Sequence, residues 1–276
     1  MSKSFSDIME TSEDTVLIVD ALNLAFRWKH MGSTFFREDY YNTVYSLANS
    51  YNCGKIIITA DMGQSWYRKA IHPEYKGNRK KLQETQTDEE KKAFKDFIVE
   101  YNNTLQFLED QDLLVLKYEN TEADDIAAYL TKIMTQNIWL ISTDRDWDLL
   151  INKRVNRFSY VTRKEVTINN WPYDVSIEDY ISFKCLTGDT GDNIPGITGI
   201  GPKRAATLIE KYGSVFDIYD HIPLAGTAKF IQNLNAGKEL LLLNHELMDL
   251  LTYCGEALGK EVCDDIRYKT KEYLGD

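Results

Sequence analysis

The sequence of 276 residues has little cysteine and little proline, and it has no long apolar run. Its four cysteines are scattered, without a CxxC pair or a histidine at ligand spacing, so neither a zinc site nor a disulfide framework is expected. No stretch approaches the ~18 consecutive apolar residues of a membrane span, and the polar N-terminus lacks the apolar core of a signal peptide. These absences predict a cytoplasmic protein that does not engage a membrane.

Positive charge is also in short supply, with 32 Lys and Arg against 43 Asp and Glu, a net charge of −11. This balance at first argues against a nucleic-acid-binding protein, because an excess of acids repels phosphate groups. Net charge does not say where the acids lie, however. Nine of them occupy the few positions described below, and without those nine the acidic and basic residues nearly balance.

The first part of the chain alternates short β-branched runs with segments of helical length. Continuous apolar runs of this kind are typical of strands that are buried on both faces of a parallel sheet. The predicted strands are 15–19, 55–60, 113–118 and 138–143, the predicted helices are 39–50, 88–108 and 123–135, and 155–160 with 165–168 are a hairpin or edge strands. After about Pro172 the pattern changes to helices and glycine turns, with helices predicted at 176–186, 203–212, 215–221 and 228–251. The sequence therefore predicts a parallel α/β domain at residues 1–172 and a mostly helical region at 173–276.

Three of the predicted strands end at an aspartate, namely Asp20, Asp61 and Asp144. In an open parallel sheet, ligands bind outside the carboxyl ends of the strands, so these three side chains are expected to converge on one crevice. A single aspartate at such a position could equally well cap the helix that follows. Three at equivalent positions favour a site.

More carboxylates cluster at 122–125, at 144–146 and in the glycine-punctuated turn 188–193. Asp144 and Asp146 are two residues apart, so in an extended segment their side chains point to the same side. Helix capping would explain one or two of the three acids at 122–125, but three within four residues repel one another unless a cation lies among them. An ordinary turn would explain the pair at 144–146, and a solvated loop would explain the acids of 188–193. Together they complete a set of nine: Asp20, Asp61, Glu122, Asp124, Asp125, Asp144, Asp146, Asp189 and Asp192. An all-oxygen set suits Mg²⁺ or Mn²⁺ rather than zinc, and nine carboxylates exceed what one ion needs. Two ions stabilise both the attacking and the leaving oxygen of a phosphoryl displacement, so phosphodiester hydrolysis is the expected reaction.

The segment 66–81 holds six Lys or Arg and a single acid, Glu74, with aromatic residues interleaved. This composition is typical of a segment that binds phosphates and stacks on bases, and a solvated basic loop is the alternative. Because Asp61 lies just before the segment, the functional interpretation is favoured.

The segment 196–204 (GITGIGPKR) superficially resembles a Walker loop, but Pro202 precedes its lysine and no Ser or Thr follows that lysine. It fits better as a hairpin between two helices. The free backbone amides of such a hairpin and the N-terminus of the helix that follows donate hydrogen bonds to a backbone phosphate, and Lys203 and Arg204 lie beside them. A plain connecting turn is the alternative.

Taken together, these motifs resemble the flap endonuclease and 5′-nuclease family, most closely the stand-alone 5′-exonucleases of tailed phages. The matching segments follow one another in family order: 18–20 (IVD), 60–61 (AD), 75–79 (YKGNR), 122–125 (EADD), 142–146 (STDRD), 188–195 (GDTGDNIP) and 196–203 (GITGIGPK). The resemblance implies a nuclease core with a helical arch inserted at about 62–95. It also implies a helix-hairpin-helix (helix-three-turn-helix) motif whose turn lies within 188–213.

The resemblance further implies residue roles. Lys76 and Arg79 match the arch residues that contact the scissile phosphate. The first metal group comprises Asp20, Asp61, Glu122, Asp124 and Asp125, and the second comprises Asp144, Asp146, Asp189 and Asp192. The implied DNA contacts are Arg68, Tyr75, Lys76, Arg79, Gly199, Gly201, Lys203 and Arg204, with Arg27, Lys29 and His30 as further candidates. Relatives also hold a potassium ion on carbonyls of the hairpin turn.

The expected function is therefore a monomeric, Mg²⁺- or Mn²⁺-dependent 5′-nuclease that cleaves DNA at 5′ flaps, 5′ ends and junctions during replication or repair. If the chain is phage-encoded, it acts in the host cytoplasm. The C-terminal residues show no sliding-clamp binding box. Two alternatives remain. One is a DNA-junction binding protein whose acids only hold structural ions. The other is a small metal-dependent ribonuclease of related core, which would need neither the arch nor the glycine hairpin.

Overall fold

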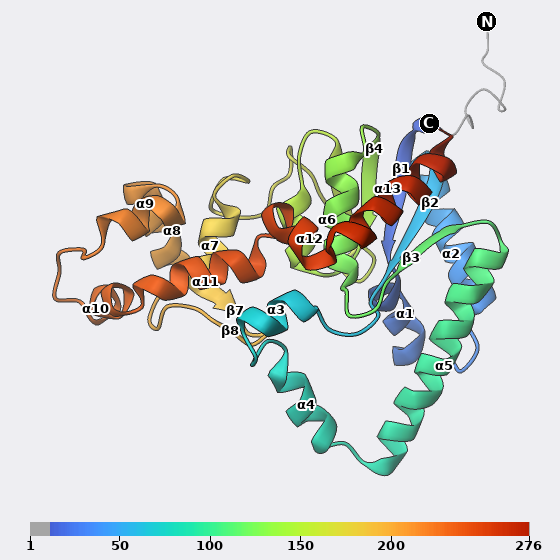
Figure 1. The fold of residues 1–276 in the computed structure, drawn as a ribbon, viewed down its shortest axis with the longest axis horizontal. Helices are drawn as coiled ribbons and strands as arrows, with labels where there is room; N and C mark the ends of the chain where they lie inside the picture. The colour runs from blue at the N-terminus through green and yellow to red at the C-terminus, as the bar shows by residue number, and fades with distance from the viewer. Residues whose placement is uncertain (1–11, 276) are drawn as a thin grey trace, which may run out of the picture. The chain divides into compact units, whose positions relative to one another are not determined.

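The computed structural model describes residues 12–275, and its chain divides into two compact units (Figure 1). Unit 1 comprises the chain up to Ser65, Gln86–Asn170 and the chain from Cys254 onward, and unit 2 comprises Trp66–Thr85 and Trp171–Tyr253. The units differ from the predicted domains because 66–85 joins unit 2 and the C-terminal segment joins unit 1. Within the described part of the chain, no helix is long and apolar enough to cross a membrane.

Unit 1 is built on a six-stranded sheet in which β1 lies near the centre, with Val16–Val19 fully buried. The strands are β1 (Ser12–Asp20), β2 (Cys53–Ala60), β3 (Leu114–Lys117), β4 (Asn137–Ile141), β5 (Val155–Ser159) and β6 (Lys164–Val166). Their order is β3-β2-β1-β4-β5-β6, and every neighbouring pair is parallel except β5 and β6. This confirms the predicted fold class, because only a sheet buried on both faces accommodates four consecutive apolar residues such as Val16–Val19.

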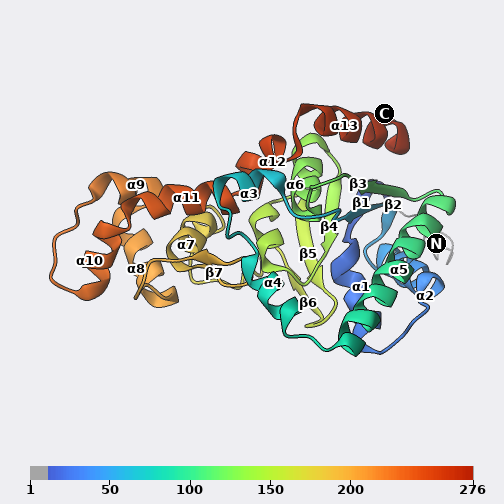
Figure 2. The ribbon, with the colours of Figure 1, turned by 60° about the horizontal axis from the view of Figure 1, so that its bottom comes forward.

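Helices cover both faces of this sheet. They are α1 (Ala21–His30), α2 (Arg37–Ser50), α5 (Asp88–Asp110), α6 (Ala123–Ile133) and α13 (Lys260–Leu274), with a short 3₁₀ helix η2 (Arg145–Leu150). In Figure 2, α1, α2 and α5 lie on one side of the sheet and α6 and α13 lie on the other. Leu17 and Val19 of β1 belong to the core beneath the first group, as the alternation of side chains along a strand requires.

Unit 2 is helical apart from one short hairpin. Its elements are α3 (Trp66–Ile71), α4 (Gly77–Glu84), α7 (Tyr180–Thr187), β7 (Gly188–Asp189), β8 (Ile194–Pro195), α8 (Pro202–Tyr212), α9 (Val215–His221), α10 (Lys229–Ala236) and α11 (Lys238–Met248). Helix α12 (Leu250–Leu258) runs across the boundary between the units. The single helix predicted over 228–251 was wrong. Gly237 caps the end of α10 and begins α11, so the segment forms two helices.

Candidate functional site

The carboxyl ends of three neighbouring strands carry the first group of predicted carboxylates. Asp20 is the last residue of β1, Asp61 follows β2 directly, and Asp144 follows β4 after two residues. Because β1 pairs in parallel with both β2 and β4, these ends meet at one edge of the sheet. The structure therefore brings the three side chains together, as the sequence predicted.

Asp20 lies at the centre of this edge and is only 6% exposed. Its Oδ1 accepts a hydrogen bond from the Asn23 amide at 3.2 Å, and its Oδ2 accepts one from the Ser142 hydroxyl at 2.8 Å. Burial, followed by the negative charges of Asp61 and Asp144, raises the pKa of Asp20 well above its usual range, and the Ser142 hydrogen bond only partly offsets this. The edge of the sheet thus gathers negative charge that a cation would stabilise.

The start of α6 adds three further acids to unit 1. Glu122 is its N-cap residue, and Asp124 and Asp125 lie in its first turn, with Glu122 and Asp125 buried. The Asp61 carboxylate accepts a hydrogen bond from the Ala123 amide at 2.7 Å, so Asp61 also caps this helix. The buried Trp147 indole donates to Asp124 Oδ1 at 2.6 Å and fixes its orientation. Capping and metal binding are therefore compatible uses of the same residues.

The segment after β4 was predicted to be extended, with Asp144 and Asp146 on the same side. That prediction was wrong. Asp144 is the N-cap of the 3₁₀ helix η2, and its carboxylate accepts a hydrogen bond from the Asp146 amide at 2.9 Å. Aspartate readily caps such a turn with its own carboxylate. The prediction considered only the alternation of side chains along an extended segment and so missed this turn. Asp144 is exposed and Asp146 is half-buried.

Sequence reasoning missed the side chains that hold this edge in place. The Ser142 hydroxyl accepts the Asp144 amide at 3.1 Å while it donates to Asp20. The buried Arg157 guanidinium donates to the Ser142 carbonyl at 2.9 Å and forms a two-pronged ion pair with Asp148, at 2.6 and 3.0 Å. Arg157 therefore positions Ser142 without touching the carboxylate edge. The serine lies within the matched segment 142–146, but Arg157 and Asp148 carried no sequence signal.

Unit 2 holds the two remaining carboxylates, and both are paired with cations. Asp189 accepts hydrogen bonds from Lys184 Nζ at 3.2 Å and from the Gly191 amide at 2.8 Å. Burial alone would raise the pKa of Asp189, but the Lys184 charge and these hydrogen bonds lower it below its usual value. Asp192 accepts hydrogen bonds from Tyr75 Oη at 3.1 Å and Arg79 Nη2 at 2.9 Å, with Lys76 Nζ at 3.7 Å.

The basic segment that precedes α4 is more deeply packed than the sequence suggested. Tyr75 and Arg68 are each only 2% exposed, and the Arg68 guanidinium donates to the Leu247 carbonyl at 2.8 Å. Lys76 is also buried, whereas Arg79 is exposed. Among the expected DNA contacts in this segment, Arg79 is therefore the side chain most open to a ligand, and burial of Arg68 and Tyr75 favours a structural role inside unit 2.

The predicted glycine hairpin follows the β7–β8 pair. A Cβ on Gly196 would lie 2.2 Å from the Thr187 carbonyl oxygen, so only glycine allows the strand to pass this closely. Gly199 has a φ of +87°, and Gly201 is the N-cap residue of α8, with Pro202 in its first turn. Lys203 and Arg204 follow in the same exposed turn. The helix start and its two cations are thus arranged as expected for a phosphate site.

The three further candidates at the end of α1 differ in their surroundings. Arg27 and His30 are exposed. The Lys29 ammonium lies over the rings of Phe26 and Phe94, at 5.0 and 4.8 Å from their centres. Lys29 is therefore engaged in cation–π contacts on the protein itself.

The donor chemistry of unit 1 fits a hard divalent cation, since its carboxylates are close enough to perturb one another and no histidine or thiol takes part. Within residues 12–275, however, no three His, Cys, Asp or Glu side chains are already arranged as metal ligands. Several of the oxygens instead accept the hydrogen bonds described above. A bound metal ion would replace some of these hydrogen bonds or bind to another lone pair of the same oxygens.

Two family models together span nearly the whole chain. Residues 15–174 match "5′-3′ exonuclease, N-terminal resolvase-like domain", and residues 175–269 match "5′-3′ exonuclease, C-terminal SAM fold". The chain belongs to the 5′-3′ exonuclease family. This confirms the resemblance that the motifs carried.

Relatives within this family are similar over almost their full length. The chain is 41% identical to the flap endonuclease of Escherichia phage T5, over 99% of this chain and 98% of that protein. It is 29% identical to flap endonuclease Xni of Shewanella denitrificans, over 86% of this chain and 93% of that protein. A crystal structure of the phage T5 flap endonuclease, in a pseudo-enzyme-product complex with DNA and metal ions, aligns with a TM-score of 0.89 at 40% identity, covering 95% of this chain and all of that one.

Proposed function

We propose that the protein is a metal-dependent 5′-nuclease that hydrolyses DNA phosphodiesters at 5′ flaps, 5′ ends and single-strand/duplex junctions in DNA replication or repair. The observation that carries this proposal is the buried Asp20 carboxylate, whose pKa is raised by burial and by the facing charges of Asp61 and Asp144. Such a concentration of carboxylates has little structural value unless a cation binds there. Membership of a family with flap endonucleases supplies the reaction class.

Magnesium is the proposed ion, with manganese as a substitute, because both prefer carboxylate oxygens. When bound, such ions polarise water and stabilise charge on the reacting oxygens of a phosphodiester. The first group would use Asp20, Asp61, Glu122, Asp124 and Asp125, and the second would use Asp144, Asp146, Asp189 and Asp192. The binding of metal ions by the related phage T5 enzyme supports this assignment.

The remaining roles fall to the basic residues of unit 2. Lys76 and Arg79 are proposed to bind the scissile phosphate, where their charges neutralise the negative charge that develops on the phosphoryl oxygens. Gly199, Gly201, Lys203 and Arg204 are proposed to bind the duplex backbone at the start of α8. Arg68 and Tyr75, which are buried, would support these contacts by holding the segment between α3 and α4.

A potassium ion at the hairpin turn is a further part of the proposal, and two carbonyl oxygens of the turn are already hydrogen-bonded. The Thr198 carbonyl accepts the Asn233 amide at 2.8 Å, and the Gly199 carbonyl accepts the Arg204 guanidinium at 2.5 Å. An ion would use the second lone pair of each oxygen and would meet the Arg204 charge. Duplex binding compared in potassium and tetramethylammonium chloride at equal concentration tests this: equal affinity in the two salts excludes the ion.

The protein is proposed to act as a monomer in the cytoplasm, that of the host cell if it is phage-encoded, without recruitment by a sliding clamp. Analytical ultracentrifugation with and without flap DNA tests the stoichiometry. A dimer that persists at nanomolar protein would contradict it.

The decisive experiment is cleavage of labelled flap, nicked and RNA substrates with and without Mg²⁺. We expect Mg²⁺-dependent cleavage of the DNA flap, and loss of cleavage in Asp144→Ala and Asp189→Ala while flap binding largely survives. Asp110→Ala, which removes an exposed acid at the end of α5, serves as the matched control. Binding without cleavage in the wild type would instead identify a junction-binding protein, and preferential cleavage of RNA would identify a ribonuclease.

A further inference from the structure

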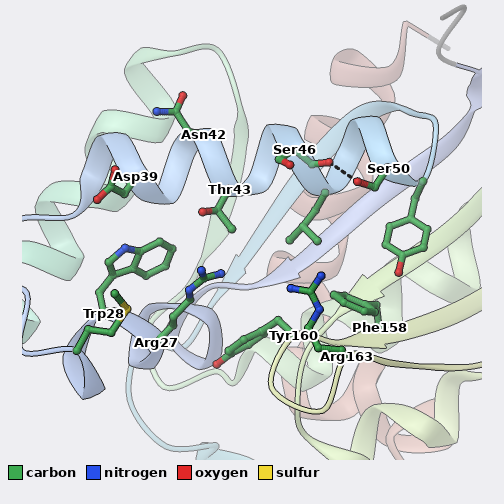
Figure 3. Close-up of a pocket in the computed structure, with 13 residues that line it drawn as sticks. Arg27, Trp28, Asp39, Asn42, Thr43, Ser46, Ser50, Phe158, Tyr160 and Arg163 are labelled. Carbon is green, nitrogen blue, oxygen red and sulfur yellow. Dashed lines mark hydrogen bonds between the residues drawn. The ribbon is translucent and has the colours of Figure 1, made fainter.

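A groove in unit 1 is lined by residues of α1, α2 and the turn between β5 and β6, including Arg27 and His30 among the candidate DNA contacts. It consists of two adjoining hollows of about 660 and 510 Å³, which share Arg27, Tyr160 and Arg163 as lining residues. The larger hollow extends from these residues to α2 and is shown in Figure 3. Hollows of this size accommodate ligands of nucleotide dimensions rather than a single ion.

Two arginines from separate elements supply positive charge to the groove. Arg27 lies in the last turn of α1, and Arg163 ends the turn between β5 and β6, with a left-handed φ of +56°. In Figure 3 both guanidinium groups point toward α2. Within the described residues, neither forms an ion pair. Asp39 on the α2 side is the one acid among the residues that line the two hollows.

The walls of the groove combine aromatic rings with small polar side chains. Tyr51, Phe158 and Tyr160 are half-buried, so each ring keeps part of its surface open. Burial, and then the Asp20 charge, raises the pKa of Tyr160 to about 12, so its hydroxyl stays neutral and donates to the Asn23 carbonyl. On the opposite wall, α2 presents Asn42, Thr43 and Ser46. Aromatic faces with nearby hydroxyl and amide groups suit an unpaired base, whose face and edge are both available.

The inner hollow reaches the carboxylate edge through Asn23 and Thr143. The Asn23 side-chain oxygen accepts both the amide and the hydroxyl of Thr143, each at 3.0 Å, and the Asn23 backbone amide donates to the Asp20 carboxylate. Thr143 directly precedes Asp144. A polynucleotide with one phosphate at the carboxylates could therefore continue into the groove.

We propose that this groove binds an unpaired stretch of DNA next to the cleavage site, with Arg27 and Arg163 on its phosphates and Tyr160 against a base. This inference rests on the proposed nuclease function for the identity of the ligand. It adds Arg163, Tyr160 and the polar wall of α2 to the substrate-binding surface. Duplex DNA fits less well, because its base faces are stacked and cannot meet the rings.

The test is the binding of a short oligothymidine and of a blunt duplex in EDTA, titrated with salt. The double variant Arg27→Ala/Arg163→Ala should lose about tenfold in affinity for the single strand. Its dependence of log affinity on log salt should become shallower by ~1.4, since each lost phosphate contact accounts for ~0.7. Binding of the blunt duplex should change less than twofold. Lys153→Ala/Lys271→Ala, which removes two exposed cations of unit 1 away from the groove, is the charge-matched control.

Stacking is tested separately with 2-aminopurine in the oligonucleotide. Its fluorescence should be quenched on binding to the wild type and to Tyr160→Phe, and the quenching should be lost in Tyr160→Leu. The phenylalanine variant keeps the ring and loses only the hydrogen bond to Asn23, so it separates stacking from local packing. Quenching that survives in Tyr160→Leu would overturn the proposed base contact.

A free nucleotide shares the phosphate and base chemistry of a strand, so thymidine 5′-monophosphate is titrated in parallel. Affinity that rises with oligonucleotide length supports a strand, whereas equal affinity for the mononucleotide overturns it. Equal losses on single strand and duplex, or in the control variant, also overturn the proposal. Because all binding is measured without a divalent metal, these results do not depend on cleavage, and failure of the nuclease proposal would be seen separately in the flap assay.

Discussion

The Arg79 guanidinium donates a hydrogen bond to the Asp192 carboxylate at 2.9 Å. The sequence assigned these two residues to different tasks, one to the substrate phosphate and the other to a metal ion. Tyr75 and Lys76 approach the same carboxylate, so Asp192 holds three groups of the basic segment in unit 2. A phosphate that binds Arg79 must therefore compete with Asp192 for its charge. Without a bound phosphate, the hydrogen bond to Asp192 holds the Arg79 guanidinium in place.

Replacing Arg79 with alanine is expected to slow flap cleavage by about 10²-fold, because the lost charge stabilises the transition state of phosphoryl transfer. Stability should be nearly unchanged, since the side chain is 54% exposed and surface ion pairs contribute only about 0–1 kcal/mol. Single-turnover cleavage and thermal unfolding measure the two effects. Arg79→Lys keeps the charge without the planar fork and should recover part of the rate. A large loss of stability with normal cleavage would show that the pair is structural.

The buried pair of Asp148 and Arg157 leads to a second prediction. Arg157→Met leaves Asp148 uncompensated in the core, so unfolding should become easier by about 3–5 kcal/mol. Adding Asp148→Leu should restore most of this stability, because an apolar pair replaces the ion pair. Cleavage should stay impaired in the double variant, since the Ser142 carbonyl has lost its Arg157 donor. Chemical denaturation together with the Mg²⁺ dependence of cleavage makes the comparison. Recovery of both properties would rule out a positioning role for Arg157.

The pH dependence of stability should respond to Glu100, which accepts hydrogen bonds from the Phe36 amide and from Arg37. Burial raises the pKa of Glu100, but the Arg37 and Phe36 hydrogen bonds outweigh it and the net pKa is lowered from 4.5. The stabilisation is therefore present above pH 4.5 and is lost as the pH falls through the lowered value. Glu100→Gln should lower the free energy of unfolding by about 1.5–3 kcal/mol at neutral pH. Its free energy of unfolding should also fall less steeply than that of the wild type as the pH is lowered. Urea unfolding at several pH values measures this. If the free energy of unfolding falls equally steeply with decreasing pH in both proteins, Glu100 does not cause the loss of stability in acid.

The strand ends were predictable because their cause is local. Apolar runs identify the strands, and parallel pairing then brings Asp20, Asp61 and Asp144 to one edge. Helix α1 was not predicted, since it begins directly after β1 and its start depends on Asp20 acting as its cap. Contacts between distant segments left no local pattern at all. One example is the packing of α3 in unit 2, where the Tyr67 hydroxyl donates to Glu246 at 2.9 Å and Arg68 binds the Leu247 carbonyl.

The hairpin turn of unit 2 gives the last prediction. Lys203 lies in the exposed first turn of α8, where free amides and the helix dipole favour a phosphate. Lys203→Ala should weaken binding to duplexes of different sequence by similar factors, because a phosphate contact carries no base information. The dependence of log affinity on log salt should become shallower by about 0.9. Lys211→Ala removes the same charge from the last turn of the same helix and should leave both quantities nearly unchanged. Fluorescence anisotropy on two unrelated duplexes over a range of salt concentrations measures the effect. A loss confined to one sequence, or an equal loss in the Lys211 variant, would contradict a phosphate contact at the helix start.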